Sequence, residues 1–218
     1  LARGLISYMP IDNSDSKYIV NSVFNKVEHN CWSHSLNILF IGGLNARKRL
    51  DILIESIYIC HLQGIKFSLK IIGEGSAKKE LVRLIDKYNL SEYIEFFGNI
   101  ECFQTKEEII RGTFISVSPG QAGLSILESF SYGIPFLTWK RAISGGEIRN
   151  IVDGYNGFLT HKACPIEFAN RLIYLHQNRK LVEAASNNSF VYYNKFANGQ
   201  LMSDRFLSII SGNNIENK

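Results

Sequence analysis

A glycine-rich stretch, SPGQAGLSILE at residues 118–128, has residue types and spacing that could do chemistry. It joins a short apolar run, typical of a buried strand, to apolar residues at helical spacing. At such a junction, unpaired backbone N–H groups and the positive end of the helix dipole favour an anion. Gly120 and Gly123 let the backbone approach a ligand, and Glu128 lies one turn into the helix. The stretch predicts an anion site, with an ordinary strand-to-helix turn as the alternative.

Two cations follow a second apolar run. Residues 37–41 are continuously apolar and end at Gly42 and Gly43, and Arg47 and Lys48 come next. Cations at the start of a helix are mildly unfavourable, which favours a functional reason for them, such as contact with a phosphate. Glu128 could accept hydrogen bonds from two vicinal hydroxyls, as on a ribose. Together these groups predict a nucleoside diphosphate as the ligand.

The sequence lacks the motifs that are typical of several other functions. The sequence has no GxxxxGK[ST] stretch and no GxGxxG after the first apolar run, which disfavours ATP hydrolysis and Rossmann-type NAD binding. Its four cysteines lie far apart without a CxxC pair, so we expect reduced thiols and no zinc site. No DxD pair follows a strand, so we predict no metal and no cofactor, with the charge of a diphosphate met by Arg, Lys and amides.

The elements that must position these residues alternate along the chain. Apolar runs predict strands over residues 37–41, 67–72, 93–97, 113–117, 133–138 and 157–160. Helical spacing predicts helices over residues 48–64, 76–90, 105–110, 146–152, 165–177, 181–189 and 199–210, with another from Leu124. Ser76 and Thr105 are the expected N-caps, and Gly64 is the expected C-terminal glycine. This alternation indicates an α/β fold with a doubly wound parallel sheet.

Ligands of such sheets bind beyond the carboxyl ends of the strands. That rule places several glycine-bearing loops on one rim of the sheet. They are Gly43, Gly73 to Gly75, Gly98 with Asn99, Gly120 to Ser125, and the loop after Thr138.

Composition fits one main domain. The chain has 218 residues, of which 45% are hydrophobic and 20% charged, enough for one sizeable core. We expect the domain to span residues 36–211, with 212–218 as a frayed tail. Residues 1–35 have little periodicity and begin at Leu1, so we expect a linker or the remnant of a missing N-terminal domain. A net charge of +4 with scattered cations does not predict nucleic-acid binding.

The motifs and their order resemble the C-terminal, nucleotide-sugar-binding domain of GT-B glycosyltransferases of the retaining family-4 type. The resemblance covers roughly residues 37–210. The matching stretches are LFIGGLNARKRLDILI at 39–54, IIGEG at 71–75, IEFFGN at 94–99, GLSILESFSYGIP at 123–135 and GYNGFL at 154–159.

The resemblance implies roles for residues on the rim. Arg47, Lys48 and Glu128 are the implied catalytic residues, with Glu128 holding the ribose hydroxyls. The implied substrate-binding residues are Gly42, Gly43, Gly73, Gly98, Asn99, Ile100, Gly120, Gln121, Ala122, Gly123, Leu124, Ser125 and Glu128.

Two positions depart from the family pattern. The family has two glutamates separated by seven residues; Glu128 matches the second, and Gly120 stands where the first is expected. The carboxylate that contacts the donor sugar is therefore absent, and Gln121 is a candidate to replace it by hydrogen bonding. The family's diphosphate-binding arginine falls at Gly43, and Arg47 could supply the lost charge.

The implied function is transfer of a sugar, with retention, from a nucleotide-sugar to a glycan or lipid-linked acceptor. A bacterial surface-polysaccharide pathway would place the protein in the cytoplasm, at the inner face of the membrane through the missing domain. A GT-B-type epimerase or a non-catalytic nucleotide-sugar-binding subunit is one alternative, motivated by Gly120. A flavodoxin-like interaction domain without a nucleotide is another.

Overall fold

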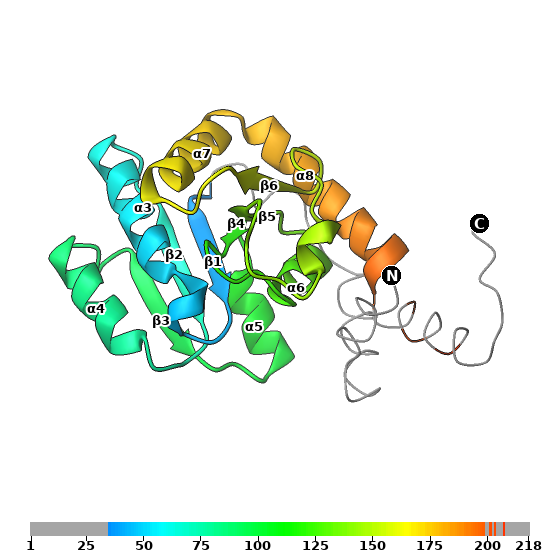
Figure 1. Cartoon of the computed structure of the whole chain (residues 1–218), viewed down its shortest axis with the longest axis horizontal. Helices are drawn as coiled ribbons and strands as arrows, with labels where there is room; N and C mark the ends of the chain where they lie inside the picture. Colours follow the sequence, from blue (N-terminus) through cyan, green and yellow to red (C-terminus); the bar gives the residue numbers. More distant parts are fainter. Residues whose placement is uncertain (1–34, 199–200, 202, 204–206, 208–218) are drawn as a thin grey trace.

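The structure, a computed structural model, describes residues 35–198 together with Leu201, Ser203 and Leu207. Its centre is a sheet whose six strands are β1 (Asn37–Ile41), β2 (Ser68–Ile72), β3 (Ile94–Gly98), β4 (Thr113–Val117), β5 (Phe136–Trp139) and β6 (Gly157–Thr160). The strand order is β3-β2-β1-β4-β5-β6, and all neighbouring strands are parallel (Figure 1). The predicted doubly wound parallel sheet is confirmed.

The apolar run of β1 is continuous because both faces of the sheet are covered. Successive side chains of a strand point to opposite faces. Ile38 and Phe40 belong to an apolar cluster beneath one set of helices, whereas Leu39 and Ile41 belong to a second cluster, with Ile110. All four β1 side chains are buried, so each face needs its own apolar residues.

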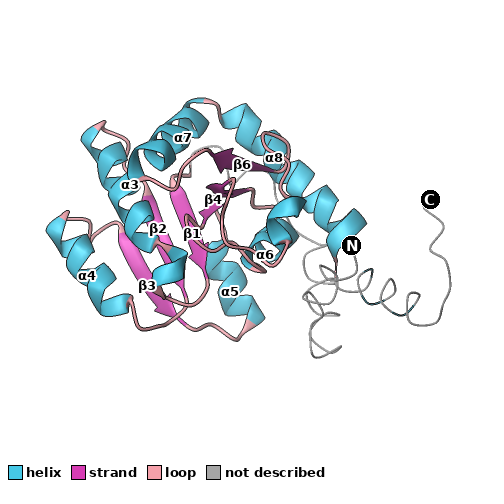
Figure 2. Ribbon diagram, viewed as in Figure 1, coloured by secondary structure: helices cyan, strands magenta, loops and turns pink. Residues whose placement is uncertain are grey.

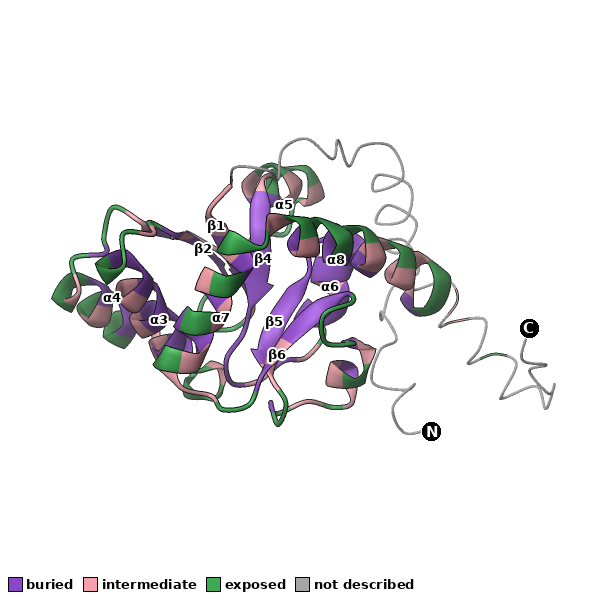
Figure 3. Cartoon of the chain, turned by 90° about the horizontal axis from the view of Figure 1, so that it is seen from above, coloured by how far each residue is buried: buried purple, intermediate pink, exposed green. Residues whose placement is uncertain are grey.

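Helices cover both faces of the sheet (Figure 2). The α-helices of the described chain are α3 (Leu50–Leu62), α4 (Lys78–Lys87), α5 (Phe103–Ile110), α6 (Ser125–Ser131), α7 (Pro165–Gln177) and α8 (Arg179–Tyr192). Shorter turns are η2 (Ala46–Lys48), η3 (Glu147–Asn150) and the π-turn η4 (Tyr193–Ala197). Helices α3, α4 and α7 share a cluster with Ile38 and Phe40, and α5 packs on the opposite face. Figure 3 shows that the strands are mostly buried, whereas the helices that pack on them have exposed outer sides.

The order of the strands creates a switch point between β1 and β4. From β1 the chain moves outward through β2 to β3, and then crosses to β4 on the other side of β1. The connections after β1 and β4 therefore leave on opposite faces. Ligands of doubly wound sheets bind at the carboxyl ends of the strands at such a switch point, and we call this place the crevice. The loops that follow β1 and β4 are the two that carry the predicted catalytic residues.

The predicted helix over residues 48–64 is wrong at its start. Residues Ala46–Lys48 form the separate 3₁₀ turn η2, and α3 begins only at Leu50. Arg49 between them has a φ of 52°, a left-handed conformation that interrupts the helix. At the other end, Gly64 has a φ of 82° just beyond α3, as expected for a C-terminal glycine.

The two predicted N-caps are also wrong. Helix α4 begins at Lys78 after Ala77, and no side chain caps it, so Ser76 lies outside. Helix α5 begins at Phe103, which places Thr105 inside its first turn. The strand predicted from residue 133 begins at Phe136, because the Ile134 amide donates to the Ser129 carbonyl at 2.9 Å and closes the turn after α6.

Other predictions on the chain have mixed outcomes. The predicted helix over 146–152 is the shorter 3₁₀ turn η3, and the predicted helix over 181–189 extends over α8. The predicted linker, the tail over 212–218 and most of the helix over 199–210 lie outside the described residues. Cys60, Cys102 and Cys164 are free thiols. No helix within the described ranges has the length and apolar character to cross a membrane.

Candidate functional site

Backbone hydrogen bonds join the loop after β1 to the loop after β4. The amide of Gly120 donates to the Lys48 carbonyl at 3.1 Å, and the amide of Gln121 donates to the Arg47 carbonyl at 2.8 Å. The Lys48 ammonium crosses the same junction and donates to the Gln121 carbonyl at 3.1 Å. The structure thus brings the predicted cations and the glycine-rich stretch together at the switch point.

Gly120 is where the two backbones touch. A Cβ at this position would lie 2.1 Å from the Arg47 carbonyl oxygen and 2.9 Å from the Lys48 carbonyl carbon. No side chain fits there without moving the loop, since real Cβ atoms do not approach backbone so closely. The turn η2 therefore occupies the space that the glutamate expected by family pattern would need.

Turn η2 presents its two cations differently. The Asn45 side chain accepts from the Arg47 amide at 3.1 Å and holds the turn. The Arg47 side chain is exposed, whereas Lys48 is half-buried and lies against Gly42. Burial lowers the pKa of Lys48 below its ordinary value, and the Glu147 carboxylate partly opposes this shift. Lys48 is the cation that the fold fixes in place, and Arg47 is free to turn toward a ligand.

Unused hydrogen-bond donors line the start of α6. Among the described residues, none accepts from the amides of Gly123, Leu124 and Ser125. The Ser125 hydroxyl is buried, and it too has no hydrogen-bond partner within the described chain. Buried polar groups are normally satisfied, so these donors are available to an acceptor such as a phosphate oxygen.

Glu128 is half-buried on α6, and its carboxylate already has a partner. Its Oε1 pairs with the Lys106 ammonium of α5 at 2.9 Å. The neighbouring Tyr132 has a pKa raised by burial and then by the negative charge of Glu128. The sequence did not reveal this ion pair, because Lys106 lies in a different helix. The carboxylate keeps a second oxygen that can accept hydroxyl hydrogen bonds.

The predicted base-binding residues lie beside the same crevice. The Gly73 amide donates to the Gly98 carbonyl at 2.8 Å, and the Gly42 amide donates to the Ile72 carbonyl at 3.0 Å. A Cβ at Gly73 would lie 2.1 Å from the Gly42 carbonyl oxygen, so the loops after β1, β2 and β3 are in direct contact. Beyond them Asn99 is exposed, and Ile100 packs on the cluster around Leu39.

A third loop, after β5, joins the site; the sequence predicted this loop on the rim but singled out none of its residues as a site residue. The Ala122 amide donates to the Ile143 carbonyl at 2.9 Å, and the Ile143 amide donates to the Gly120 carbonyl at 3.2 Å. This pairing carries the chain to Glu147, whose side chain is buried beside Gly123. The signal in the sequence was an acid directly after Gly145 and Gly146 in a loop that leaves a strand.

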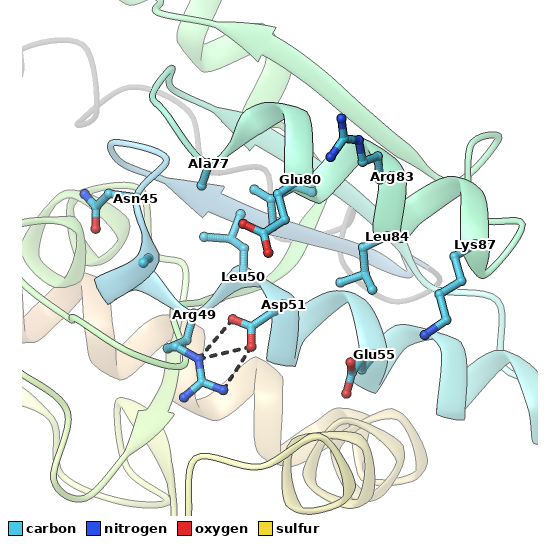
Figure 4. Close-up of a pocket in the computed structure, with 12 residues that line it drawn as sticks. Asn45, Arg49, Leu50, Asp51, Glu55, Ala77, Glu80, Arg83, Leu84 and Lys87 are labelled. Atoms are coloured by element: carbon cyan, nitrogen blue, oxygen red, sulfur yellow. Dashed lines mark hydrogen bonds and ion pairs between the residues drawn. The ribbon is translucent and has the colours of Figure 1, made fainter.

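A hollow of about 530 Å³ lies elsewhere, between α3 and α4 (Figure 4). Leu50, Leu81 and Leu84 line it together with charged residues of both signs. Arg49 points into this region and forms an ion pair with Asp51 at 2.9 Å. None of the predicted site residues lines the hollow, although Asn45 and Ala46 of the loop after β1 do. In the described part of the chain, no group of three His, Cys, Asp or Glu could hold a metal ion.

Comparison with known proteins gives a match over most of the chain. The family model described as Glycosyl transferases group 1 matches residues 26–191. An uncharacterized glycosyltransferase of Methanocaldococcus jannaschii is 28% identical over 183 residues, which are 82% of this chain and 49% of that protein. The GtfA subunit of a UDP-N-acetylglucosamine–peptide N-acetylglucosaminyltransferase from Limosilactobacillus reuteri is 32% identical over 129 residues, 58% of this chain and 24% of that protein. The chain spans half or less of the length of the curated relatives that it matches.

Solved structures share the fold. The C-terminal domain of the group 1 glycosyl transferase LpcC from Francisella tularensis has a TM-score of 0.64 at 20% identity, covering 88% of this chain and 96% of that domain. Pneumococcal GtfA, an O-GlcNAc transferase solved with UDP and GlcNAc, has a TM-score of 0.68 at 19% identity, with 81% and 35% covered. Anabaena HepE, solved with UDP and glucose, has a TM-score of 0.70 at 18% identity, with 95% and 54% covered. At these identities the likeness concerns the fold, which is the C-terminal half of the GT-B architecture.

Proposed function

Because the chain belongs to the glycosyl transferases group 1 family, we propose that the crevice between β1 and β4 binds a nucleotide-diphosphate sugar. The sugar is then transferred to an acceptor hydroxyl with retention of configuration. One observation carries this proposal: the loops after β1 and β4 are joined at the switch point, and they present Lys48 and unused amides there. A fold alone does not fix a function, so the proposal depends on this arrangement of groups.

The diphosphate is proposed to lie against the cationic side of the crevice. Lys48 and Arg47 supply positive charge, and the Gly123, Leu124 and Ser125 amides supply donors. The same groups would stabilise the charge that develops on the leaving diphosphate in the transition state. The reaction would then need no metal ion at this position.

The nucleoside is proposed to extend toward β3. The Glu128 carboxylate accepts hydrogen bonds from the ribose hydroxyls, and its ion pair with Lys106 holds it in place. The backbone around Gly98, Asn99 and Ile100 holds the base. UDP is the first nucleotide to test, because pneumococcal GtfA and Anabaena HepE were solved with it.

The acceptor is proposed to be a glycan or a lipid-linked sugar, in a bacterial surface-polysaccharide pathway. A partner N-terminal domain would bind it, and the catalytic cleft would lie between the two halves. That domain would also bring the enzyme to the cytoplasmic face of the membrane.

Calorimetry with UDP and GDP tests the proposal. Wild-type protein should bind one of them, and Glu128→Ala should weaken that binding about tenfold, because a charged hydrogen-bond acceptor for the ribose is lost. Glu183→Ala is the matched control. Glu183 is exposed on α8, and Arg179 of that helix bonds to Ser35 beside the amino end of β1, opposite the crevice. Wild-type protein that binds neither nucleotide would reject the proposal and favour a flavodoxin-like interaction domain.

A further inference from the structure

Glu147 is the one acidic side chain of the described chain that is buried, with 6% of its surface exposed. It lies in the loop after β5. Hydrogen bonds of Ile143 with Gly120 and Ala122 join this loop to the loop after β4. None of the ion pairs among the described residues includes it. A buried carboxylate without an ion pair is costly, so its place beside the crevice calls for an explanation.

The two oxygens of the Glu147 carboxylate have different surroundings. The Ser144 hydroxyl donates to Oε2 at 2.7 Å, and the same hydroxyl accepts from the Gly146 and Ile148 amides at 3.1 Å. This arrangement fixes the orientation of the carboxylate. Oε1 faces Gly123, where an added Cβ would stand 3.8 Å away, and no described group donates to it. One oxygen is therefore held by the protein, and the other is open to a ligand beside the glycine.

We propose that Glu147 binds hydroxyl groups of the donor sugar, in place of the carboxylate that the family carries at the position of Gly120. This inference rests on the proposed function, because it needs a nucleotide-sugar in the crevice. Gly120 has no room for a side chain, since the Arg47 carbonyl fills that space. The loop after β5 is bonded to Gly120 itself, so it delivers an acid to the same part of the rim from a different element.

Charge determines which part of the donor meets Glu147. A carboxylate repels a diphosphate and attracts hydroxyl donors, whereas Lys48 and the free amides favour the diphosphate. Glu147 also acts electrostatically on Lys48, which places the acid next to the cationic end of the crevice. The sugar is bonded directly to the diphosphate, so its hydroxyls fall within reach of an acid in this place.

The test compares Glu147→Gln with wild-type protein, using the full chain and calorimetry with UDP, UDP-glucose and UDP-N-acetylglucosamine. The glutamine keeps an acceptor for Ser144 and removes the charge. We expect the Kd for UDP to change less than twofold and the Kd for at least one UDP-sugar to rise about tenfold, the loss of a charged hydrogen bond. Ser144→Ala keeps the carboxylate but removes the hydroxyl that orients it. This variant should also bind the UDP-sugar more weakly, with a smaller rise in Kd than Glu147→Gln and little change in the Kd for UDP.

Two results would overturn the inference. One is an equal loss of UDP and UDP-sugar binding in Glu147→Gln, which would mean that the acid acts through Lys48 on the diphosphate. The other is unchanged binding of all three ligands in both variants. If the wild-type protein binds no nucleotide, the proposed function is rejected and this inference with it. If UDP binding depends on Glu128 but Glu147→Gln binds all three ligands as the wild type does, only the inference is rejected.

Discussion

Lys48 is the residue of the site whose environment differs most from that of an ordinary surface lysine. Its ammonium is half-buried between Gly42 and the Gln121 carbonyl, and burial disfavours the charged form. A diphosphate placed against it would favour the charged form, because opposite charges at close range raise the pKa of a lysine. Binding and protonation are therefore linked at this one side chain.

This linkage predicts a pH dependence of nucleotide affinity. The pKa of Lys48 in the free protein lies below its ordinary value of 10.5, and a bound diphosphate would raise it. Affinity for UDP should stay level around neutral pH and fall as the pH rises through the lowered pKa, earlier than an exposed lysine would titrate. Calorimetry between pH 7 and 10 measures this fall.

Lys48→Arg is the matched control for that experiment, because a guanidinium stays charged over the whole range. Its affinity should depend less on pH than that of the wild type. The same alkaline fall in both proteins would show that another group is responsible.

Individual site residues could be predicted from the sequence only where a motif fixed them. Glu128 and Lys48 belong to ordered motifs; the structure places Lys48 against the glycine-rich stretch and Glu128 on the helix that follows it. Glu147 belongs to no such motif, and its proposed role becomes visible only because the hydrogen bonds of Ile143 to Gly120 and Ala122 place two distant loops side by side. Lys106, the partner of Glu128, was missed for the same reason, since nothing in the sequence around Lys106 indicates that α5 lies beside α6.

At the scale of elements, the loops after β1 and β4 depend on each other's shape. Gly120→Ala should lower the free energy of unfolding by about 1–3 kcal/mol, because the added methyl overpacks against the Arg47 carbonyl. Chemical denaturation with urea measures the change.

Gly43→Ala is the control for packing in the same region. The nearest atom to its added methyl would be the Asn45 side-chain nitrogen at 3.7 Å, an ordinary contact. Its stability should stay within about 0.5 kcal/mol of wild type. Equal unfolding midpoints for the two variants would contradict the close approach at Gly120.

The strands were predictable as elements, and the helix starts were not. Each buried strand has a continuous apolar run, so its signal is local. A helix start depends on the backbone conformation of one or two residues. Arg49 adopts a left-handed conformation directly after a turn whose carbonyls accept from Gly120 and Gln121, and the sequence around residue 49 gives no sign of this contact with a distant loop. Ser76 and Thr105 are residue types that often cap helices, but α4 has Ala77 and α5 has Cys102 at the N-cap position instead.

At the scale of the whole molecule, the fold matches the C-terminal half of the GT-B architecture, and the chain spans half or less of the length of its curated relatives. The doubly wound parallel sheet followed from the alternation of elements, which is why the fold class could be predicted, whereas the strand order comes from the structure. The pairing between loops distant in sequence could not be predicted, and this pairing assembles the candidate site.

We predict that residues 1–218 alone bind the nucleotide but do not transfer sugar efficiently. In the proposed enzyme a second domain binds the acceptor, and the catalytic cleft would need a wall from each domain. A transfer assay with radiolabelled UDP-sugars and a lipid-linked acceptor would measure this, with calorimetry on the same preparation confirming that UDP binds. A full transferase rate from this chain alone would contradict the prediction.

The backbone bonds that join the loops after β1, β4 and β5 also have a thermodynamic consequence. Ordering a loop around a ligand costs conformational entropy, which reduces the affinity that a given set of contacts can deliver. Here the amides of Gly120, Gln121 and Ala122 are already committed to neighbouring loops before any ligand arrives. That entropy is lost during folding instead of binding, so this rim should behave as a rigid receptor, with little loop rearrangement between its free and bound states.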